Sequence, residues 1–559
     1  MLLSVLLLSQ LWACDQTPIA WQAVTEPSVA AVLADSASHH LSGTPEPKVL
    51  AAVTVRQNQP DGQWQVSAQV DSASNPFDVR AYVVFTHLAS GQSVTTGMFY
   101  TGDDQWAWRF TGSLPGQWTF KSHSRVADLH GWSGAVRVSA DVKGLGFIEN
   151  TEGYWSRSAG QAFVPSLVMY GSPAYVRDHG ERLESDLALY LEHHGFNGLH
   201  VPVLCRWFDV DETECDDVDE PNPDLHTFTA LEQLIEAAYA RGGMVHLWLW
   251  GDSERKQNPE FLQREGGLGG VADQRLHRYI AARLGPLPGW TLGYGFDLWE
   301  WVTAEELQAW QHKLADELGW PHLLGARGPK NQLSEIYAGL DYVGFEQHRP
   351  WLPGLRAARQ YDSTRPIMSE DRFRFRGAEQ RTKDYTPEEM LLGIWQSALA
   401  GGVGAIWGNL VARPGGGRSR AIANGEAPSA PLPNAAAMRF AHLYIENHWS
   451  PPVQFCDAEQ SAYGCILLPT SGLQLRLYER CDALELPAGT VGQTVRVIDI
   501  HRPENPFWQG KLGTTPQVLS LSGTSDWLVE ITEPAKSEPV PTDSENGSTV
   551  QAAAPGVGR

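Results

Sequence analysis

Between about residue 160 and residue 410, short apolar runs alternate with stretches of helical periodicity. The runs are FVPSLVMYG, GLHVPVLCRWF, MVHLWLWGD, WTLGYGFDLWE, HLLGAR, DYVGFEQH, RPIMSED and GVGAIWGNL, and the helical stretches include ALEQLIEAAYARG, AEELQAWQHKLADEL and PEEMLLGIWQSALAGG. Such alternation is typical of parallel β/α folds, and eight strands over about 260 residues fit one (β/α)8 TIM barrel. A doubly wound open sheet is the alternative. The barrel is favoured because every run ends on polar or aromatic residues, as a mouth built from strand tips requires.

On both sides of this region, strand patterns replace the helical periodicity. From Val49, stretches such as DVRAYVVFTH and QWTFKSHS alternate apolar and polar residues, with turns at Asp61-Gly62, Ser90-Gly91 and Pro115-Gly116. Beyond Pro451, the runs YGCILLPT, LQLRLYER, TVRVIDI and DWLVEIT predict a second set of short strands. We therefore expect a multidomain chain with an N-terminal β-sandwich over 48–142, a catalytic barrel over 143–445 and a C-terminal β-sandwich over 446–532.

The first residues of the chain predict an exported protein. The run MLLSVLLLSQLWAC is apolar but too short to span a membrane, which is typical of an export signal over residues 1–14. Leu11-Trp12-Ala13-Cys14 resembles a bacterial lipoprotein processing box, in which Cys14 would carry the lipid. A polar linker over 15–47 and a disordered tail over 533–559 complete the organisation. We expect a periplasmic or cell-surface lipoprotein, or a secreted protein.

The cysteines and the acidic charge limit the partners and cofactors. Cys205/Cys215 and Cys456/Cys465 are close enough in sequence to pair in an oxidising compartment, which leaves Cys481 odd. The formal net charge of -23 argues against nucleic acid and anionic membranes as bulk partners, and a lipid at Cys14 would be the membrane contact. No spacing resembles a zinc site, and the acidic run over 209–224 reads as a solvated loop rather than a calcium site. No cofactor is predicted, and the sequence leaves the oligomeric state open.

Acidic residues gather where the apolar runs of the barrel stop. Some glutamates of the region have a structural explanation, since Thr303 with Glu306, and Thr386 with Glu389, have the spacing of helix capping boxes. The acids at the strand tips have none: Asp252, Asp297, Glu300, Glu346, Glu370 and Asp371. Hydrolysis of a glycosidic bond needs two carboxyl groups flanking that bond, and opposite strands of a barrel mouth can supply them. The tips therefore indicate a glycoside hydrolase.

These motifs resemble the clan A glycoside hydrolases, and among them the apiosidase-like glycosidases. The stretches NPFDVRAYVVFTH and GMFYTGDDQWAWRFTGSLPGQWTF resemble the sandwich domain that often precedes such barrels. The resemblance implies an acid/base on the fourth strand and a nucleophile on the seventh. It makes Glu370 of the SED motif the nucleophile, unless Glu370 serves only as an ion-pair partner of neighbouring arginines. The fourth strand reads GYGFDLWEW in place of the frequent Asn-Glu, so the acid/base is either Asp297 or Glu300.

Further residues at the strand tips are candidates to line sugar subsites or to pack the rim. They are Arg206, Trp207, Trp250, Asp252, Arg327, Glu346, His348, Arg372, Arg374, Trp407 and Asn409, with Gln347 beside His348. Arg372 and Arg374 belong to a larger basic set that continues at Arg376, Arg381 and Lys383 and beyond the eighth run at Arg413, Arg418 and Arg420. A planar guanidinium suits carboxylate and sulfate oxygens, so the substrate is expected to be an acidic glycan, unless these arginines only balance acidic neighbours at the surface.

The sequence thus predicts hydrolysis of O-glycosidic bonds in a polysaccharide or its oligosaccharides, by two carboxylates and with retained configuration. Two alternatives remain open. One is a barrel that has lost catalysis and only binds carbohydrate; the other is a uronate lyase, which would form an unsaturated product.

Overall fold

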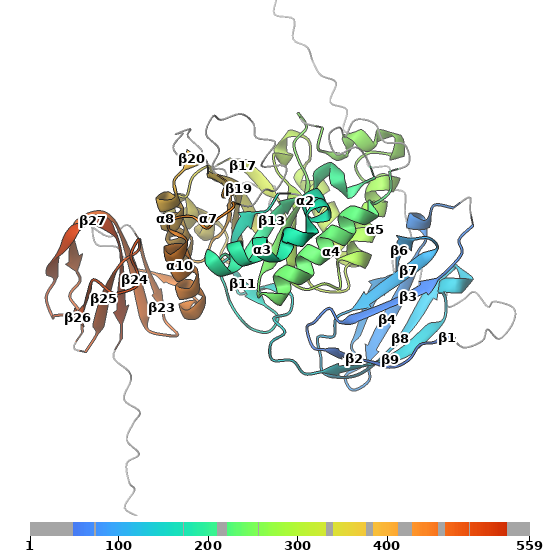
Figure 1. Cartoon of the computed structure of the whole chain (residues 1–559), viewed down its shortest axis with the longest axis horizontal. Coiled ribbons are helices and arrows are strands. Elements are labelled where there is room, and N and C mark those ends of the chain that lie inside the picture. Colours follow the sequence, from blue (N-terminus) through green and yellow to red (C-terminus); the bar gives the residue numbers. More distant parts are fainter. Residues whose placement is uncertain are drawn as a thin grey trace, which may run out of the picture.

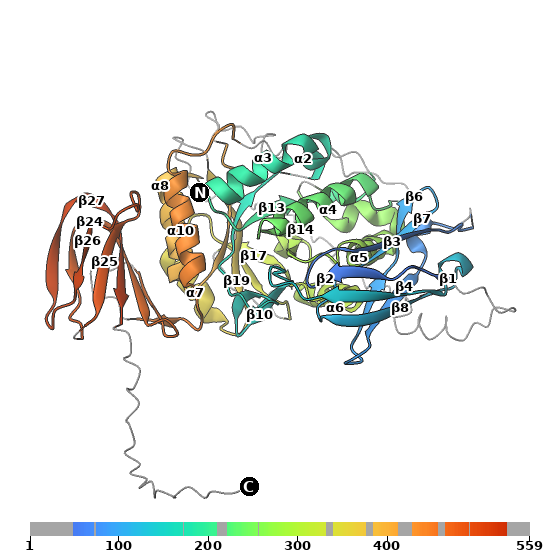
Figure 2. The ribbon, with the colours of Figure 1, turned by 60° about the horizontal axis from the view of Figure 1, so that its bottom comes forward.

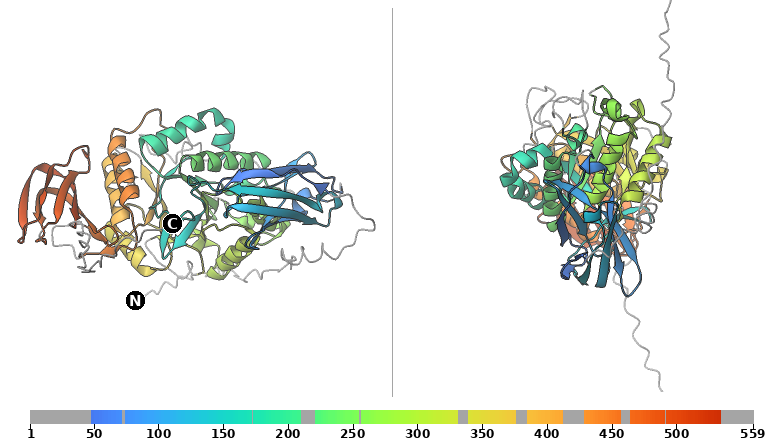
Figure 3. Two further views of the ribbon diagram at one scale, coloured as in Figure 1. Left: turned by 90° about the horizontal axis from the view of Figure 1, so that it is seen from below. Right: turned by 90° about the vertical axis from the view of Figure 1, so that its right-hand side faces the viewer.

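The computed structural model describes residues 48–533, except 72–73, 172, 210–220, 255, 331–338, 376–383, 412–427, 457–463 and 491. Strands of the N-terminal part, a central β/α body and a C-terminal sheet follow one another along the molecule (Figure 1). The N-terminal strands and the C-terminal sheet lie at opposite ends of this body (Figure 3). Cys14, and the predicted linker and tail apart from Glu533, lie outside the described residues.

The N-terminal part consists of two β-sheets, paired mainly antiparallel, that share one aromatic core. The larger sheet contains β1 (Lys48–Val49), β2 (Val53–Arg56), β4 (Ala81–His87), β5 (Ser93–Gly97), β8 (Gly116–Ser124) and β9 (Trp132–Ser139). The smaller one contains β3 (Gly62–Ser67), β6 (Phe99–Gly102) and β7 (Gln105–Phe110). Alternation in β3 buries every second residue, and Trp64 there contacts Phe85 and Phe120 of the larger sheet. The short helices η1 (Pro76–Asp78) and η2 (Ala127–Leu129) complete this part.

Eight strand positions form a parallel barrel, as the sequence predicts. Their order around the barrel is β12 (Ser166–Met169), β13 (Gly198–Pro202), β14 (Met244–Trp250), β15 (Trp290–Gly295), β16 (Leu324–Gly325) with β17 (Arg327–Lys330), β18 (Val343–Glu346), β19 (Ile367–Phe375) and β21 (Gly404–Trp407). Because β16 and β17 are consecutive pieces of the fifth strand, pairing of β15 with β16 and of β17 with β18 closes the ring. The short β20 (Asp384–Tyr385) pairs with the far end of β19.

Helices surround the barrel, and the two predicted capping boxes are confirmed at Thr303/Glu306 and Thr386/Glu389. The α-helices are α2 (Pro173–Asp178), α3 (Leu183–Leu187), α4 (Leu225–Ala240), α5 (Val271–Arg283), α6 (Ala304–Glu317), α7 (Leu352–Tyr361), α8 (Pro387–Leu399) and α10 (Ala435–His448). The 3₁₀ and π helices are η3 (Gly180–Arg182), η4 (Ala188–His193), η5 (Leu204–Trp207), η6 (Pro259–Glu265) and η7 (Leu298–Glu300). Within the described residues, no helix combines the length and hydropathy of a membrane span.

A hairpin covers the end of the barrel at which the strands begin. Its strands are β10 (Ile148–Thr151) and β11 (Tyr154–Arg157), which pair antiparallel. Trp155 of β11 is buried, and its indole N–H donates to the carbonyl of Ile367, the first residue of β19, at 3.0 Å. This contact places the hairpin opposite the mouth, so the strand tips remain the open end.

The C-terminal strands form one six-stranded sheet against helices α8 and α10. Its order is β22 (Gln454–Phe455), β23 (Gly464–Leu468), β24 (Leu473–Leu486), β27 (Gln517–Thr532), β25 (Thr494–Asp499) and β26 (Trp508–Lys511). The sheet stands beside the two helices (Figure 2), where Tyr444 of α10 donates to Glu530 at 2.7 Å. Cys456 and Cys465 form the expected disulfide and Cys481 is free. Cys205 is also disulfide-bonded, whereas Cys215 lies outside the described residues.

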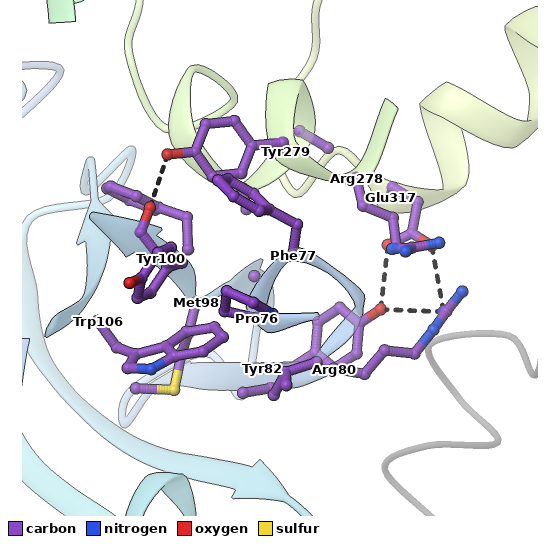
Figure 4. Close-up of a pocket in the computed structure, with 16 residues that line it drawn as sticks. Pro76, Phe77, Arg80, Tyr82, Met98, Tyr100, Trp106, Arg278, Tyr279 and Glu317 are labelled. Atoms are coloured by element: carbon purple, nitrogen blue, oxygen red, sulfur yellow. Dashed lines mark hydrogen bonds and ion pairs between the residues drawn. The ribbon is translucent and has the colours of Figure 1, made fainter. Parts of the chain in front are cut away.

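Buried ion pairs join the N-terminal sheets to the barrel helices. Glu232 of α4 accepts hydrogen bonds from Arg109 of β7 and Arg283 of α5, and all three side chains are buried. Arg275 of α5 pairs with Asp78 of η1 at 2.8 Å. Beside them lies an aromatic crevice of about 440 Å³, part of it open to solvent, in which Tyr279 donates to the carbonyl of Tyr100 (Figure 4). These contacts fix the N-terminal part on the flank of the barrel, away from the mouth.

Candidate active site

The strand tips bring Asp297, Arg327 and Glu346 together at the mouth. Asp297 follows β15, Arg327 begins β17 and Glu346 ends β18, so they come from three neighbouring strand positions. One guanidinium nitrogen of Arg327 forms an ion pair with Asp297 and lies 3.7 Å from Glu346. His348 contacts the other oxygen of Glu346. The predicted convergence of the fourth, fifth and sixth tips is therefore present as a charged cluster.

The backbone at Asp297 has an unusual conformation. Its φ of 54° and ψ of 31° lie in the left-handed region, which a residue other than glycine seldom occupies. The next residues form η7, in which Leu298 is fully buried and the indole N–H of Trp301 donates to the carbonyl of Gly251 at 3.1 Å. Residues held in such a conformation often belong to functional sites, because the surrounding structure must compensate for the strain.

Glu300 lies on the same short helix, with an environment that favours its protonated form. Partial burial raises the pKa of Glu300, and the negative charges of Asp297 and Asp252 raise it further. Asp252 itself follows β14 and is buried. Asp297, in contrast, is in an ion pair with Arg327, an interaction that its carboxylate form makes. The two acids that the sequence left as alternatives therefore differ in their surroundings.

Glu370 lies inside the barrel and has no exposed surface. Its Oε1 accepts from the hydroxyl of Tyr342 and lies 3.0 Å from Nε2 of His246. Burial and the neighbouring Glu370 charge raise the pKa of Tyr342 well above its usual value, so Tyr342 remains a donor. Nδ1 of His246 lies 3.0 Å from Nδ1 of His200, which extends the network to β13.

The second oxygen of Glu370 differs sharply from the first. Within the described part of the chain, Oε2 is buried and has no hydrogen-bond partner. Two glycines provide the space around the carboxyl group: a Cβ at Gly344 would lie 2.8 Å from Oε2, and one at Gly293 would lie 3.1 Å from Oε1. A buried polar atom without a partner requires an explanation, and catalysis is a frequent one.

His200, His246 and Tyr342 were not among the predicted site residues. The sequence does carry a signal for the two histidines, because each interrupts an otherwise apolar run. The structure adds that they are register partners on neighbouring strands. The signal for Tyr342 was weak, since an aromatic residue at the start of an apolar run usually packs in the core. Only the closed ring shows that its hydroxyl reaches the seventh strand.

Several other predicted residues are buried or half-buried. Trp207, Trp250 and Trp407 are fully buried in the large core between strands and helices, and the indoles of Trp207 and Trp407 donate to Leu249 O and Ser166 Oγ. A sugar contact at these three tryptophans stays a prediction, because this structure shows them buried. Asn409 is buried and accepts from the backbone N–H of Val411, while Arg206 in η5 is half-buried.

The basic set is only partly described. Arg372 and Arg374 lie on β19 beyond Glu370, where the pairing of β19 with β21 changes register between Ser369 and Arg372. Arg376, Arg381, Lys383, Arg413, Arg418 and Arg420 lie outside the described residues. Arg372 and Arg374 thus follow Glu370 on one strand, and their role as a substrate-binding pair stays a prediction.

Comparisons with known proteins agree with the barrel. Residues 62–125 match a family model described as Domain of unknown function (DUF5060). A Bacteroides vulgatus ATCC 8482 structure described as a candidate glycoside hydrolase is similar over 86% of this chain and 100% of its own, with 15% identity and a TM-score of 0.66. A second structure, described as a glycoside hydrolase, covers 70% of this chain and 98% of its own, with 12% identity and a TM-score of 0.51. No curated protein sequence matches. At these identities the likeness shows the shared fold.

Proposed function

We propose that this chain hydrolyses O-glycosidic bonds in a polysaccharide or its oligosaccharides, using carboxyl groups of the fourth and seventh barrel strands. The observation that carries the proposal is the environment of Glu370, where Tyr342 and His246 hold one carboxyl oxygen and the other has no partner among the described residues. A nucleophilic carboxylate needs this arrangement, because donors fix its orientation while one oxygen remains available to the sugar. The shared fold with structures described as glycoside hydrolases agrees with it.

In the proposed reaction, Oε2 of Glu370 attacks the anomeric carbon while the acid at the β15 tip protonates the departing oxygen. The carbon–oxygen bond breaks and a glycosyl ester of Glu370 forms. Water then attacks the same carbon, the β15 acid takes its proton, and Glu370 leaves as a carboxylate, so that configuration is retained. Since Glu370 has no exposed surface here, the sugar must displace side chains above it to reach Oε2.

For the acid/base, we propose Glu300. Burial and the charges of Asp297 and Asp252 raise the pKa of Glu300, which is the direction that general-acid catalysis requires. We assign Asp297 a positioning role, in which its ion pair holds the guanidinium of Arg327 at the mouth. The resemblance to apiosidase-like glycosidases, in which an aspartate follows a glycine-containing strand, favours Asp297, so the two acids need a direct comparison.

The proposed substrate is an acidic glycan. The chain has a formal net charge of -23, so an anionic sugar requires a local basic cluster. Arg372 and Arg374 on β19 directly follow the proposed nucleophile on the same strand. Guanidinium groups there would bind the carboxylate or sulfate of a sugar next to the scissile bond.

The test is reducing-sugar release from neutral, uronate-containing and sulfated polysaccharides by wild type, Glu370→Gln, Glu300→Gln and Asp297→Asn, with exposed Glu305→Gln as a control. We expect Glu370→Gln to lose at least a thousandfold in kcat. Glu300→Gln should retain activity on aryl glycosides with good leaving groups and recover with azide, which identifies the acid/base. If Asp297→Asn shows this behaviour instead, the acid/base is Asp297.

Other outcomes of the same experiment would reject the proposal. Glycan binding without turnover in wild type would identify a carbohydrate-binding barrel. A product that absorbs in the near ultraviolet would identify a lyase. Equal activity on neutral and acidic glycans, unchanged in Arg372→Met and Arg374→Met, would reject the acidic substrate.

A further inference from the structure

Two tryptophans stand out because they are exposed. Most tryptophans of the chain are buried, and Trp108, Trp248 and Trp395, for example, have no exposed surface. Trp299 and Trp351 expose 54% and 57% of their surface, and no other tryptophan in the described residues is as exposed. Each exposed indole offers a flat apolar surface that a ligand could remove from water, so this pair is a candidate binding surface.

Both tryptophans lie on loops of the barrel mouth. Trp299 lies in η7, two residues after Asp297, and Trp351 follows the tip of β18 as the N-cap of α7. Their loops flank the fifth strand, whose Arg327 contacts Asp297, two residues before Trp299, and Glu346 at the end of β18, before the loop of Trp351. The two exposed rings are therefore tied to one charged cluster through short segments of chain.

The backbone beneath each ring is firmly held. On one side of Trp299, Leu298 is fully buried; on the other, Glu300 N–H donates to the carbonyl of Asp297 at 3.2 Å. Leu352, next to Trp351, is buried, and the carbonyl of Trp351 accepts from the amide of Gln347 at 3.1 Å and from Leu355 N–H at 3.1 Å. Rigid support lowers the entropy that binding costs, so each ring suits a preformed platform.

We propose that Trp299 and Trp351 are stacking platforms for two sugar rings of one glycan chain, which lies along the mouth over the fourth to sixth strand tips. The apolar face of a pyranose packs on a flat indole, whereas its hydroxyls remain hydrated. The inference rests on the proposed function and adds that the substrate is an oligomer or polymer, not a single glycoside. Affinity then grows with chain length until both platforms are occupied.

The experiment measures binding in the Glu370→Gln background, so that hydrolysis does not interfere. Glucose, xylose and galacturonate oligomers of two and six units are titrated by calorimetry into this protein and into versions with Trp299→Ala, Trp351→Ala, Trp299→Phe or Trp351→Phe. Each alanine should weaken binding of the hexamer about tenfold and of the dimer less, while phenylalanine restores most of it. Phe507→Ala, an exposed aromatic change in the C-terminal part, should change nothing.

If both alanine variants bind the hexamer with wild-type affinity, or if no hexamer binds at all, the proposal that Trp299 and Trp351 are stacking platforms is wrong. Failure of the proposed function gives a different result. The protein with Glu370 intact would then show no turnover, although the alanine variants would still lose hexamer binding. KM and kcat of the active protein add a second readout. The alanine changes should raise KM for long substrates more than for short ones.

Discussion

Tyr342 shows how one hydroxyl can define a site that is closed to solvent. Burial would penalise the charge of Glu370 unless donors surround it. Tyr342 and His246 supply two donors to the same oxygen, provided that His246 carries its proton on Nε2 and accepts from His200 on Nδ1. These contacts orient the carboxyl group from one side only.

Replacing Tyr342 with Phe should remove the hydroxyl without a change in shape. Since the ring is fully buried, no water replaces the lost donor, and we expect the free energy of unfolding to fall by about 1 to 3 kcal/mol. The kcat for glycan hydrolysis should fall as well, because Glu370 loses its orientation. Urea denaturation and initial rates measure the two effects, with exposed Tyr361→Phe as the control. A variant as stable as wild type would contradict this account of the network.

At the scale of elements, the sequence predicted the barrel strands well, and the site less completely. Runs such as MVHLWLWGD predicted β14, and both capping boxes predicted helix starts, because these signals are local. The fifth strand divides into β16 and β17 and β19 extends through its arginines, details that depend on closure of the ring. Likewise, the burial of Trp250 and the Tyr342 contact depend on which way a strand faces, and apolar runs do not encode this.

Gly344 on β18 is predicted to be essential to the barrel interior. A Cβ at this position would lie 2.3 Å from the carbonyl oxygen of Ala326 and 2.8 Å from Oε2 of Glu370, so neither the fifth strand nor the carboxyl group could remain in place. Gly344→Ala should therefore lower stability by about 1 to 3 kcal/mol and abolish glycan hydrolysis. Gly180→Ala is the matched control, since its Cβ would meet nothing within 4 Å. Thermal unfolding and activity that match the control would show that the strands can move apart.

The C-terminal sheet should have a pH-dependent contact between His501 and Asp526. A hydrogen bond from His501 to Asp526 at 2.9 Å is the main cause that raises the pKa of His501, although burial opposes it. Because the pKa is higher in the folded state, the stabilisation is complete below the unfolded value of about 6.5 and is lost as pH rises through the folded value. His501→Gln should thus reduce stability more at pH 6 than at pH 9, as measured by urea denaturation. An equal loss at both pH values would mean that the contact does not depend on the histidine charge.

At the scale of the whole molecule, the N-terminal sheets are fixed to the barrel by charges that folding has removed from water. Burial alone would raise the pKa of Glu232, but the hydrogen bonds and charges of Arg283 and Arg109 outweigh it and leave the pKa lowered. A buried carboxylate that accepts from two guanidinium groups is stable only while all three remain together. The N-terminal part should therefore unfold together with the barrel in one transition.

Replacing Glu232 with Gln leaves two buried guanidinium groups without a balancing charge, and we expect a loss of about 3 to 5 kcal/mol. The surface pair of Arg56 and Asp61 gives the matched control, because the Arg56 side chain is 61% exposed and Arg56→Met should cost less than about 1 kcal/mol. Calorimetry at neutral pH should show one transition for wild type and a lower, divided transition for Glu232→Gln, as the N-terminal sheets separate first. If the variant retains a single transition near the wild-type temperature, apolar contacts around Tyr100 and Tyr279 hold the two parts together, and the ion pairs only fix their orientation.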